Sequence, residues 1–222
     1  MEFDLKHVQF KHPFTAIVAG PTGSGKTVLV RNLLSEHETC MNLKKSTCNV
    51  LWGYGQWQTL YKKSIPNTKV KYIDGLPTLE DIEENKPSII VIDDLMTELS
   101  GDKKLTSLFT KGSHHMNISI IFIVQNMFHQ GKEMRTISLN TNYYVLLKNP
   151  RDRLQVEYLA KQMFPGTKGY IREAYNDATS KPYGYLIIDC KSDTPDSLRV
   201  RTRILKSEHV KELFRPIIYT PK

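Results

Sequence analysis

The sequence has few cysteines, and none of them forms a CxxC pair. Its three cysteines are Cys40, Cys48 and Cys190 in a chain of 222 residues. Such a sparse, odd-numbered set is typical of reduced thiols in an intracellular compartment and argues against a disulfide framework. His37 could join Cys40 and Cys48 around a metal ion, but a fourth ligand is missing and the spacing matches no familiar zinc pattern. We therefore expect no metal site there.

The sequence also lacks a long apolar segment and a hydrophobic leader. Its longest apolar run, residues 118–124, is far shorter than the roughly 20 residues that a membrane-spanning helix needs. Residues 1–11 carry charges throughout, where a signal peptide would have an apolar core. From these absences we expect a soluble, intracellular protein with no membrane segment.

Acidic residues are outnumbered by basic ones. The chain has 31 Lys and Arg against 23 Asp and Glu, a net charge of +8, which suits an anionic partner such as nucleic acid. Its hydrophobic content of 40% is sufficient for a packed core. No repeat or low-complexity linker divides it, so we expect one domain over residues 1–222. Its core should span about 14–205, between a basic N-terminal lead-in and a C-terminal extension.

Apolar runs alternate with amphipathic segments, a pattern typical of an α/β fold. Continuous apolar runs such as residues 118–124 indicate strands covered on both faces, so the expected fold is a mostly parallel central sheet flanked by helices. In the first helix, the expected buried stripe is Val28, Leu29 and Leu33, with Val30 as a further member. The predicted strands cover residues 14–19, 49–52, 69–73, 88–92, 118–124, 141–147, 183–190 and 198–205, and the predicted helices cover 27–36, 151–164 and 170–178, with another beginning at Thr78.

A glycine-rich loop joins the first predicted strand to the first predicted helix. It matches the pattern G-x-x-x-x-G-K-[ST] and consists of Gly20, Pro21, Thr22, Gly23, Ser24, Gly25, Lys26 and Thr27. Glycines allow successive N–H groups to surround a phosphate at the positive end of the helix dipole. Lys26 is expected to reach the β and γ phosphates, and the Thr27 hydroxyl to bind Mg²⁺. The loop therefore predicts binding of a nucleoside triphosphate.

Polar side chains follow two of the later buried strands. Asp93 and Asp94 follow one apolar run, and Gln125 follows the next. Because the carboxyl ends of parallel strands meet at one edge of a sheet, all three are expected beside the phosphates. Asp93 would hold Mg²⁺, Asp94 would polarise the attacking water, and Gln125 would contact the γ-phosphate or that water. Alternatively, the Asp pair forms a turn or a helix cap, and Gln125 is an ordinary strand-end residue.

The order of these motifs is itself informative. GPTGSGKT, IIVIDDL, LFTKGSHHMNISIIFIVQN and NYYVLLKNPRDR follow one another along the chain. In this order they resemble the FtsK–HerA superfamily, and more closely its viral genome-packaging ATPases, which occur in poxvirus-like large DNA viruses, virophages and Maverick-type transposons. The similarity runs from about residue 14 to residue 203, and residues 109–153 are its most specific part.

The resemblance implies a P-loop NTPase of the RecA/ASCE-like kind with ATP and Mg²⁺ as cofactors. It also implies a homo-oligomeric ring, usually a hexamer, that hydrolyses ATP between subunits and drives double-stranded DNA into a capsid. A capsid or portal-vertex protein would be a further partner. The expected location is the host nucleus, a cytoplasmic virus factory or the virion.

The resemblance also implies roles for individual residues. Lys26 and Thr27 match the Walker A pair, Asp93 and Asp94 the Walker B pair, and Gln125 the sensor. Cellular members usually have Asp-Glu at the Walker B position, so the shorter Asp-Asp pair leaves Glu98 as a second candidate for activating water.

A ring of this kind needs an arginine from the neighbouring subunit to stabilise charge that develops on the γ-phosphate. We rank Arg153 first, Arg151 second and Arg135 third. Alternatively, Arg151 and Arg153 simply begin the helix that follows. Candidate segments for contacting DNA phosphates are residues 57–63, 101–111 and 129–135, each of which could equally be a solvated surface loop.

Two other functions remain open on the sequence. A small P-loop nucleoside or nucleotide kinase would need an arginine-rich lid and an acceptor pocket, and neither stands out. A nucleotide-binding scaffold without appreciable turnover is compatible with the short carboxylate of Asp94. A GTPase is disfavoured because the Asn-Lys-x-Asp guanine signature is absent: residues 85–88 lack the aspartate.

Overall fold

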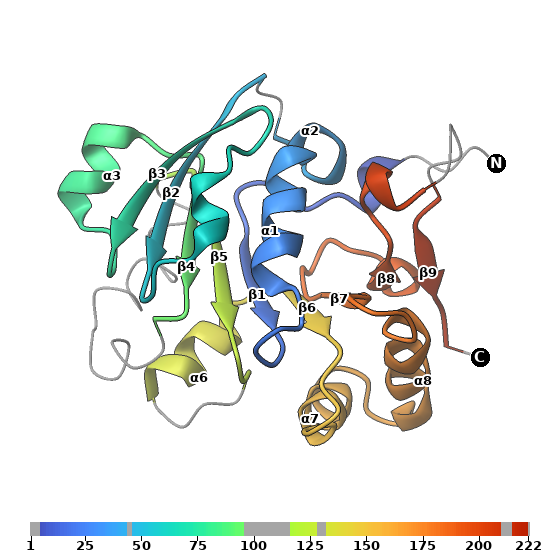
Figure 1. Cartoon of the computed structure of the whole chain (residues 1–222). Coiled ribbons are helices and arrows are strands. Elements are labelled where there is room, and N and C mark those ends of the chain that lie inside the picture. The colour runs from blue at the N-terminus through green and yellow to red at the C-terminus, as the bar shows by residue number, and fades with distance from the viewer. Residues whose placement is uncertain (1–4, 44–45, 96–115, 128–131, 210–214, 222) are drawn as a thin grey trace.

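A computed structural model describes residues 5–43, 46–95, 116–127, 132–209 and 215–221. Within these residues a nine-stranded sheet has the order β3-β2-β4-β5-β1-β6-β7-β8-β9 (Figure 1). The strands from β3 to β6 in this order are parallel, and β7, β8 and β9 continue the sheet antiparallel. The strands are β1 (Thr15–Ala19), β2 (Cys48–Tyr54), β3 (Thr68–Asp74), β4 (Ile89–Asp93), β5 (Ser119–Val124), β6 (Tyr143–Leu147), β7 (Tyr185–Asp189), β8 (Val200–Thr202) and β9 (Ile217–Tyr219).

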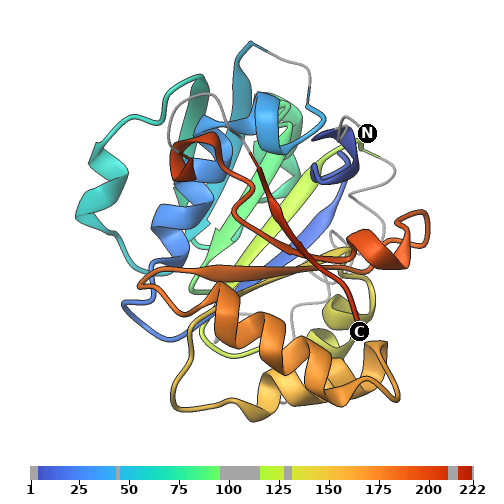
Figure 2. The same ribbon diagram turned by 90° about the vertical axis from the view of Figure 1, so that its right-hand side faces the viewer.

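Helices cover both faces of this sheet, as Figures 1 and 2 show from two sides. One face packs against α1 (Lys26–Ser35) and α2 (His37–Cys40). The other packs against α3 (Leu79–Asn85), α6 (Lys132–Leu139), α7 (Leu154–Met163) and α8 (Lys168–Ala178). Short 3-10 turns occur at η1 (Leu5–His7), η2 (Thr59–Lys62), η4 (Asp196–Leu198) and η5 (Lys206–Glu208).

The central strands contribute side chains to both of these cores. Along β1, Ala16 and Val18 point toward α1 and α2, while Ile17 and Ala19 join the cluster on the opposite face. Every residue of β1, β4, β5 and β6 is buried, which accounts for their continuous apolar runs. The predicted fold class, a single-domain α/β structure with a mostly parallel sheet between helices, is confirmed.

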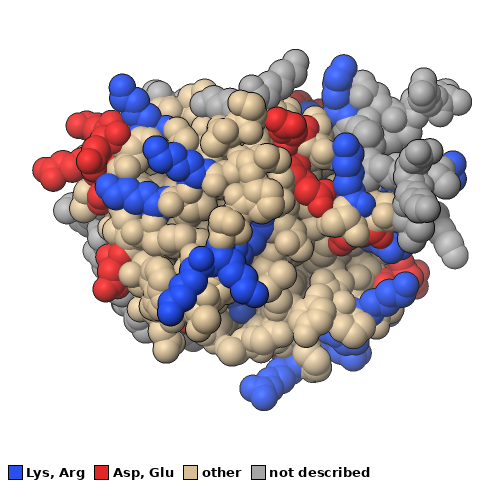
Figure 3. Space-filling model, turned by 45° about the horizontal axis from the view of Figure 1, so that its top comes forward, with Lys and Arg blue, Asp and Glu red and all other residues tan. Residues whose placement is uncertain are grey.

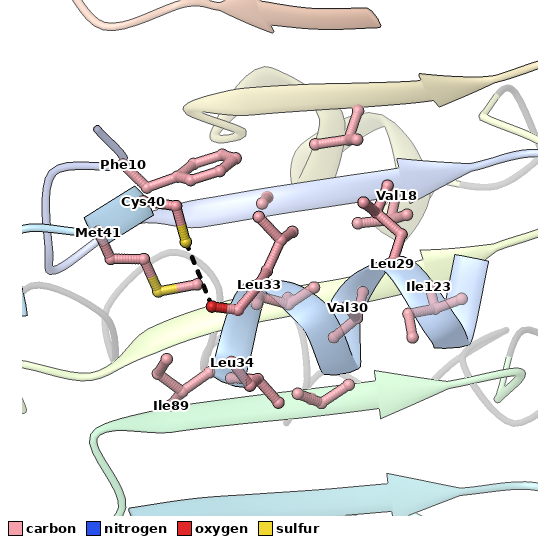
Figure 4. Close-up of a cluster of buried hydrophobic side chains, with 14 of the residues drawn as sticks. Phe10, Val18, Leu29, Val30, Leu33, Leu34, Cys40, Met41, Ile89 and Ile123 are labelled. Atoms are coloured by element: carbon pink, nitrogen blue, oxygen red, sulfur yellow. Dashed lines mark hydrogen bonds between the residues drawn. The ribbon is translucent and has the colours of Figure 1, made fainter. Parts of the chain in front are cut away.

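The buried face of α1 differs from the predicted stripe at one position. Leu29, Val30, Leu33 and Leu34 are buried and pack onto the strands, as the close-up in Figure 4 shows. Val28 was predicted to be buried but is 49% exposed. The prediction was wrong because, at 3.6 residues per turn, position 28 lies on the opposite side of the helix from the centre of the stripe.

Of the three residues considered for a metal site, His37 and Cys40 lie on α2, just after α1, and Cys48 begins β2. The Cys40 thiol donates to the carbonyl of Leu33 at 3.2 Å (Figure 4), and His37 Nδ1 lies 2.8 Å from the carbonyl of Leu34. Burial raises the pKa of the Cys40 thiol well above its ordinary value. These contacts make Cys40 and His37 part of the packing that joins α1 to α2.

Packed structure also occurs outside the expected core range of about 14–205. Phe10 is buried against Phe14 and Tyr143, and β9 extends the sheet beyond β8. The strand predicted over 198–205 is shorter, because Arg203 has a positive φ of 57° that ends β8. On β8, Arg201 is fully buried and pairs with Asp189 of β7 at 3.0 Å.

Candidate nucleotide site

The glycine-rich loop leads from the end of β1 into α1, as the sequence pattern predicted. Gly23 and Gly25 have φ values of 78° and 96°, in the left-handed region that glycine adopts without strain. Lys26 Nζ donates to the carbonyls of Gly20 at 2.7 Å and Pro21 at 3.0 Å, so it is folded back over its own loop. Burial lowers the pKa of the Lys26 ammonium, and the nearby carboxylates of Asp93 and Asp94 oppose this shift.

Asp93 ends β4 beside this loop and is buried, with only 3% of its surface exposed. Its Oδ2 accepts hydrogen bonds from the hydroxyls of Thr27 at 3.2 Å and Tyr61 at 2.8 Å. Burial raises the pKa of the Asp93 carboxyl, while these two hydrogen bonds lower it again in part. The structure therefore brings together Thr27 and Asp93, the two residues predicted to hold a metal ion.

Asp94 and Gln125 meet at the same edge of the sheet. β5 lies between β1 and β4, so its end emerges between the glycine-rich loop and Asp93. Gln125 Nε2 donates to Asp94 Oδ1 at 3.1 Å, and both side chains are exposed. Asp94 has a positive φ of 57°, which turns the chain sharply after β4. The predicted water-activating residue and the predicted sensor are thus in direct contact.

These residues line one large cavity of about 1070 Å³. One part of its wall is formed by the glycine-rich loop, Asp93, Asp94 and Gln125. Another part is formed by residues 177–178 and 180–185, by Arg203 and by strand β9 through Ile217 and Tyr219. This volume is at the upper end of the range for small-molecule sites, so a nucleoside triphosphate can be accommodated.

Tyr183 lies across the glycine-rich loop in this cavity. A Cβ atom placed on Gly25 would come within 2.9 Å of the Tyr183 ring, so the ring covers that part of the loop. Tyr183 is 71% exposed and has a positive φ of 62°. A bulky residue in this conformation is strained, and such strain is often found where a ligand is held. Sequence reasoning did not identify this residue.

The donor set around Thr27 and Asp93 fits magnesium. Mg²⁺ prefers oxygen ligands and is commonly bound by one or two protein oxygens together with substrate phosphates and water. The two hydroxyls that donate to Asp93 both reach its Oδ2, and among the described residues no hydrogen bond reaches its Oδ1. An ion bound through phosphate oxygens would therefore find a carboxylate oxygen and a hydroxyl beside it.

Tyr61 is a second residue that the sequence did not reveal as part of the site. It belongs to residues 57–63, which were predicted only as a candidate DNA-binding loop, yet it is buried with 4% of its surface exposed. Its ring packs among other aromatic side chains, namely Trp52, Tyr54, Trp57 and Tyr72. The density of aromatic residues in this stretch was the signal that could have found it, because aromatic clusters usually pack instead of facing solvent.

The candidate arginines lie away from the cavity. Arg151 and Arg153 are exposed between β6 and α7, and Arg135 is exposed on α6. None of the three is among the described residues that line the cavity. Because β6 is parallel to β1, Arg151 and Arg153 still follow the strand end at the same edge of the sheet as the glycine-rich loop. Within one chain they do not meet the nucleotide site.

Some predicted functional residues lie outside the described part of the chain. These are Glu98, residues 101–111 and residues 129–131. Of the described DNA candidates, Lys62 and Lys63 are exposed at the end of η2. The face in Figure 3 carries its basic side chains in separate groups, with acidic side chains among them. This face therefore shows no single continuous basic surface.

The fold and the site together define a class, the P-loop NTPase fold of the RecA/ASCE-like kind. The crystal structure of B204, the DNA-packaging ATPase from Sulfolobus turreted icosahedral virus, has a similar fold. It matches this chain with a TM-score of 0.53 at 12% sequence identity, and the match covers 95% of this chain and 98% of that one. The genome-packaging NTPase B204 from Sulfolobus turreted icosahedral virus 2, in complex with ATP-γS, gives 0.51 at 11% identity over 95% and 98% of the chains. Its complex with AMPPCP gives 0.50 at 10% identity over the same shares, 95% and 98%.

At these identities the likeness shows a shared fold. The resemblance to viral packaging ATPases drawn from the motifs is confirmed at that level. No protein-family model matches the sequence, and no curated protein matches it. Across the described residues, no helix combines the length and the apolar character that crossing a membrane would require.

Proposed function

We propose that this protein is an ATP-hydrolysing motor that translocates double-stranded DNA and packages a viral or virus-like genome into a capsid. The observation that carries the proposal is the convergence of Lys26, Thr27, Asp93, Asp94 and Gln125 at one edge of the sheet, in one cavity. The shared fold with the B204 packaging ATPases supports the same conclusion.

Each of these residues has a defined task in ATP hydrolysis. Lys26 leaves the loop carbonyls and donates to the β and γ phosphates, while backbone N–H groups of the loop hold the β-phosphate. Thr27 and Asp93 hold Mg²⁺, which supplies charge neutralisation on the phosphates when it is bound. Asp94 accepts a proton from the attacking water, and Gln125 orients that water against the γ-phosphate.

The active form is a homo-oligomeric ring, a hexamer as is usual in the family that the motifs resemble. Arg151 and Arg153 are exposed and lie outside the cavity of their own chain, as expected for residues that act on a neighbouring site. Their guanidinium groups would stabilise the charge that develops on the γ-phosphate across the subunit boundary. Exposed lysines such as Lys62 and Lys63 would contact DNA phosphates without reading the sequence. A capsid or portal-vertex protein would receive the ring, and the protein would act inside the infected cell or the virion.

The test is ATPase activity with and without double-stranded DNA. We expect duplex DNA to stimulate phosphate release by the assembled wild-type protein and to have no effect on Lys26→Ala. The stimulation should decline as salt is raised, because the contacts are to phosphates. An assembled ring whose activity is unchanged by DNA would contradict the motor. Transfer of phosphate to a nucleoside faster than release of free phosphate would favour a kinase, and binding without turnover would favour a scaffold.

A further inference from the structure

Tyr61, from a segment separate from the glycine-rich loop, holds the carboxylate of Asp93 together with Thr27. Its hydroxyl and that of Thr27 both donate to Oδ2, at 2.8 Å and 3.2 Å respectively. A carboxylate that receives two hydrogen bonds on one oxygen is fixed in orientation, and its second oxygen is left for another ligand. In metal sites, a residue that orients a metal ligand in this way usually changes metal affinity when it is removed.

The ring of Tyr61 is itself held in place by aromatic neighbours. Its centroid is 4.9 Å from that of Tyr72, in a stacked arrangement, and 5.4 Å from that of Trp57, edge to face. Trp52 and Tyr54 also lie within 5.6 Å of it. Aromatic contacts of this kind are directional, so a displacement of the Tyr61 ring would change the environment of its neighbours.

The same segment is joined to α1, the helix that begins at Lys26. Arg31 on α1 is buried and donates to the carbonyls of Lys63 at 2.6 Å and Ser64 at 3.1 Å. It also donates to the hydroxyl of Tyr72 at 3.1 Å. The segment around Tyr61 is therefore attached to the nucleotide site at two points, through Asp93 and through α1.

Trp57 connects this arrangement to the surface. It is 48% exposed, lines the nucleotide cavity and packs on Tyr61. Lys62 and Lys63, exposed cations that are candidates for DNA contact, follow Tyr61 directly in the chain. A change at Asp93 can thus reach both the cavity rim and these lysines through a single side chain.

We propose that Tyr61 is a positioning residue for magnesium–nucleotide binding, and that it conveys the occupancy of the site to the segment containing Trp57, Lys62 and Lys63. The inference rests on the proposed function, because it assumes that Asp93 holds Mg²⁺ with a nucleotide. It adds a residue outside the Walker motifs and a route by which nucleotide state alters a surface that can contact DNA.

The test compares two tyrosine variants of the same cluster. Tyr61→Phe removes the hydroxyl that reaches Asp93 and keeps the ring, and Tyr72→Phe removes a hydroxyl that reaches Arg31 instead. The non-hydrolysable analogue AMPPCP is kept at a fixed concentration while Mg²⁺ is titrated, and tryptophan fluorescence is recorded. Trp57→Phe identifies the part of the signal that comes from Trp57. Denaturation curves establish that each variant is folded.

We expect the Trp57 signal to change as Mg²⁺ binds to wild type. Tyr61→Phe should need about tenfold more Mg²⁺ for half of the change, the lower end of effects seen on removing such a supporting residue. Tyr72→Phe should keep the wild-type midpoint. In ATPase assays, excess Mg²⁺ should restore turnover to Tyr61→Phe, because the hydroxyl acts through Asp93.

Two results would contradict this inference and leave the proposed function standing. One is a Tyr61→Phe midpoint equal to that of wild type; the other is an unchanged Trp57 signal while calorimetry shows that wild type binds Mg²⁺ and AMPPCP. If calorimetry shows that wild type binds no AMPPCP, the proposed function fails and the inference fails with it.

Discussion

The side-chain amide of Gln125 donates a hydrogen bond to the carboxylate of Asp94 across 3.1 Å. The two residues follow neighbouring parallel strands, β5 and β4, so the contact spans the sheet edge where the cavity opens. Their proximity means that the proposed base for water and the proposed sensor of the γ-phosphate act as one unit. Variants of the two residues should therefore not have additive effects.

Asp94→Asn should bind ATP within a few-fold of wild type and hydrolyse it about 10²- to 10⁴-fold more slowly, the usual contribution of a general base. Single-turnover hydrolysis and equilibrium binding measure the two quantities separately. Adding Gln125→Ala to Asp94→Asn should reduce the rate by less than Gln125→Ala does alone. Wild-type turnover by Asp94→Asn would exclude Asp94 as the base and direct attention to Glu98.

Tyr183→Ala should weaken ATP binding about tenfold, which corresponds to about 1.4 kcal/mol of lost base stacking. The ring lies across Gly25 and lines the cavity, so it is suited to cover a nucleoside. Tripolyphosphate, which has no base, should bind the variant as it binds wild type. Tyr158→Ala is the matched control, because Tyr158 is also an exposed tyrosine but does not line the cavity. Equal losses for ATP and tripolyphosphate would contradict a role in holding the base.

Arg153→Ala should reduce ATP hydrolysis by the assembled ring by about 10³-fold or more, as expected for a trans-acting arginine. Arg151→Ala and Arg135→Ala are compared in the same assay to identify which residue acts. Mixing Arg153→Ala subunits with Asp94→Asn subunits should restore part of the activity, because some interfaces then combine an intact Asp94 with an intact Arg153. Two inactive variants that stay inactive after mixing would argue against a site shared between subunits.

Thr78→Ala should lower the free energy of unfolding by about 1 kcal/mol at neutral pH, the usual cost of losing an N-cap. Thr78 caps α3 reciprocally with Asp81. Hydrogen bonds to the Asp81 carboxylate from the Thr78 backbone N–H and then from the Thr78 hydroxyl hold the pKa of Asp81 below its ordinary value of 3.8, and Thr78→Ala removes the hydroxyl's part. A carboxyl whose pKa is lowered by folding stabilises the folded state at pH values above its unfolded-state pKa. This contribution is lost as the pH falls through its folded-state pKa. The cost of Thr78→Ala should therefore decrease below about pH 4. Urea denaturation at several pH values measures it, and a cost independent of pH would contradict the role of Asp81.

Much of this site could be predicted from the sequence, for local reasons. The glycine-rich loop depends on residues adjacent in sequence, and its glycines specify the backbone they need. Asp93, Asp94 and Gln125 were predicted because continuous apolar runs indicate buried parallel strands, and such strands end at one edge. The wrong prediction for Val28 also came from local sequence. In a short apolar helix, the spacing of the apolar residues alone does not fix which of them face the sheet.

The phosphate loop, the acidic and amide residues beside it, and the α/β class are therefore encoded in local sequence. The distant residues that complete the site follow from tertiary packing instead. Tyr61 reaches Asp93 from a separate segment, Tyr183 covers Gly25 from the turn before β7, and β9 lines the cavity from the far end of the chain. The physical reason is that a motif encodes contacts between neighbours in sequence, whereas these contacts depend on how strands are ordered in the sheet. That order places β5 beside β1 and β4 beside β5, and so makes one site from separated parts of the chain.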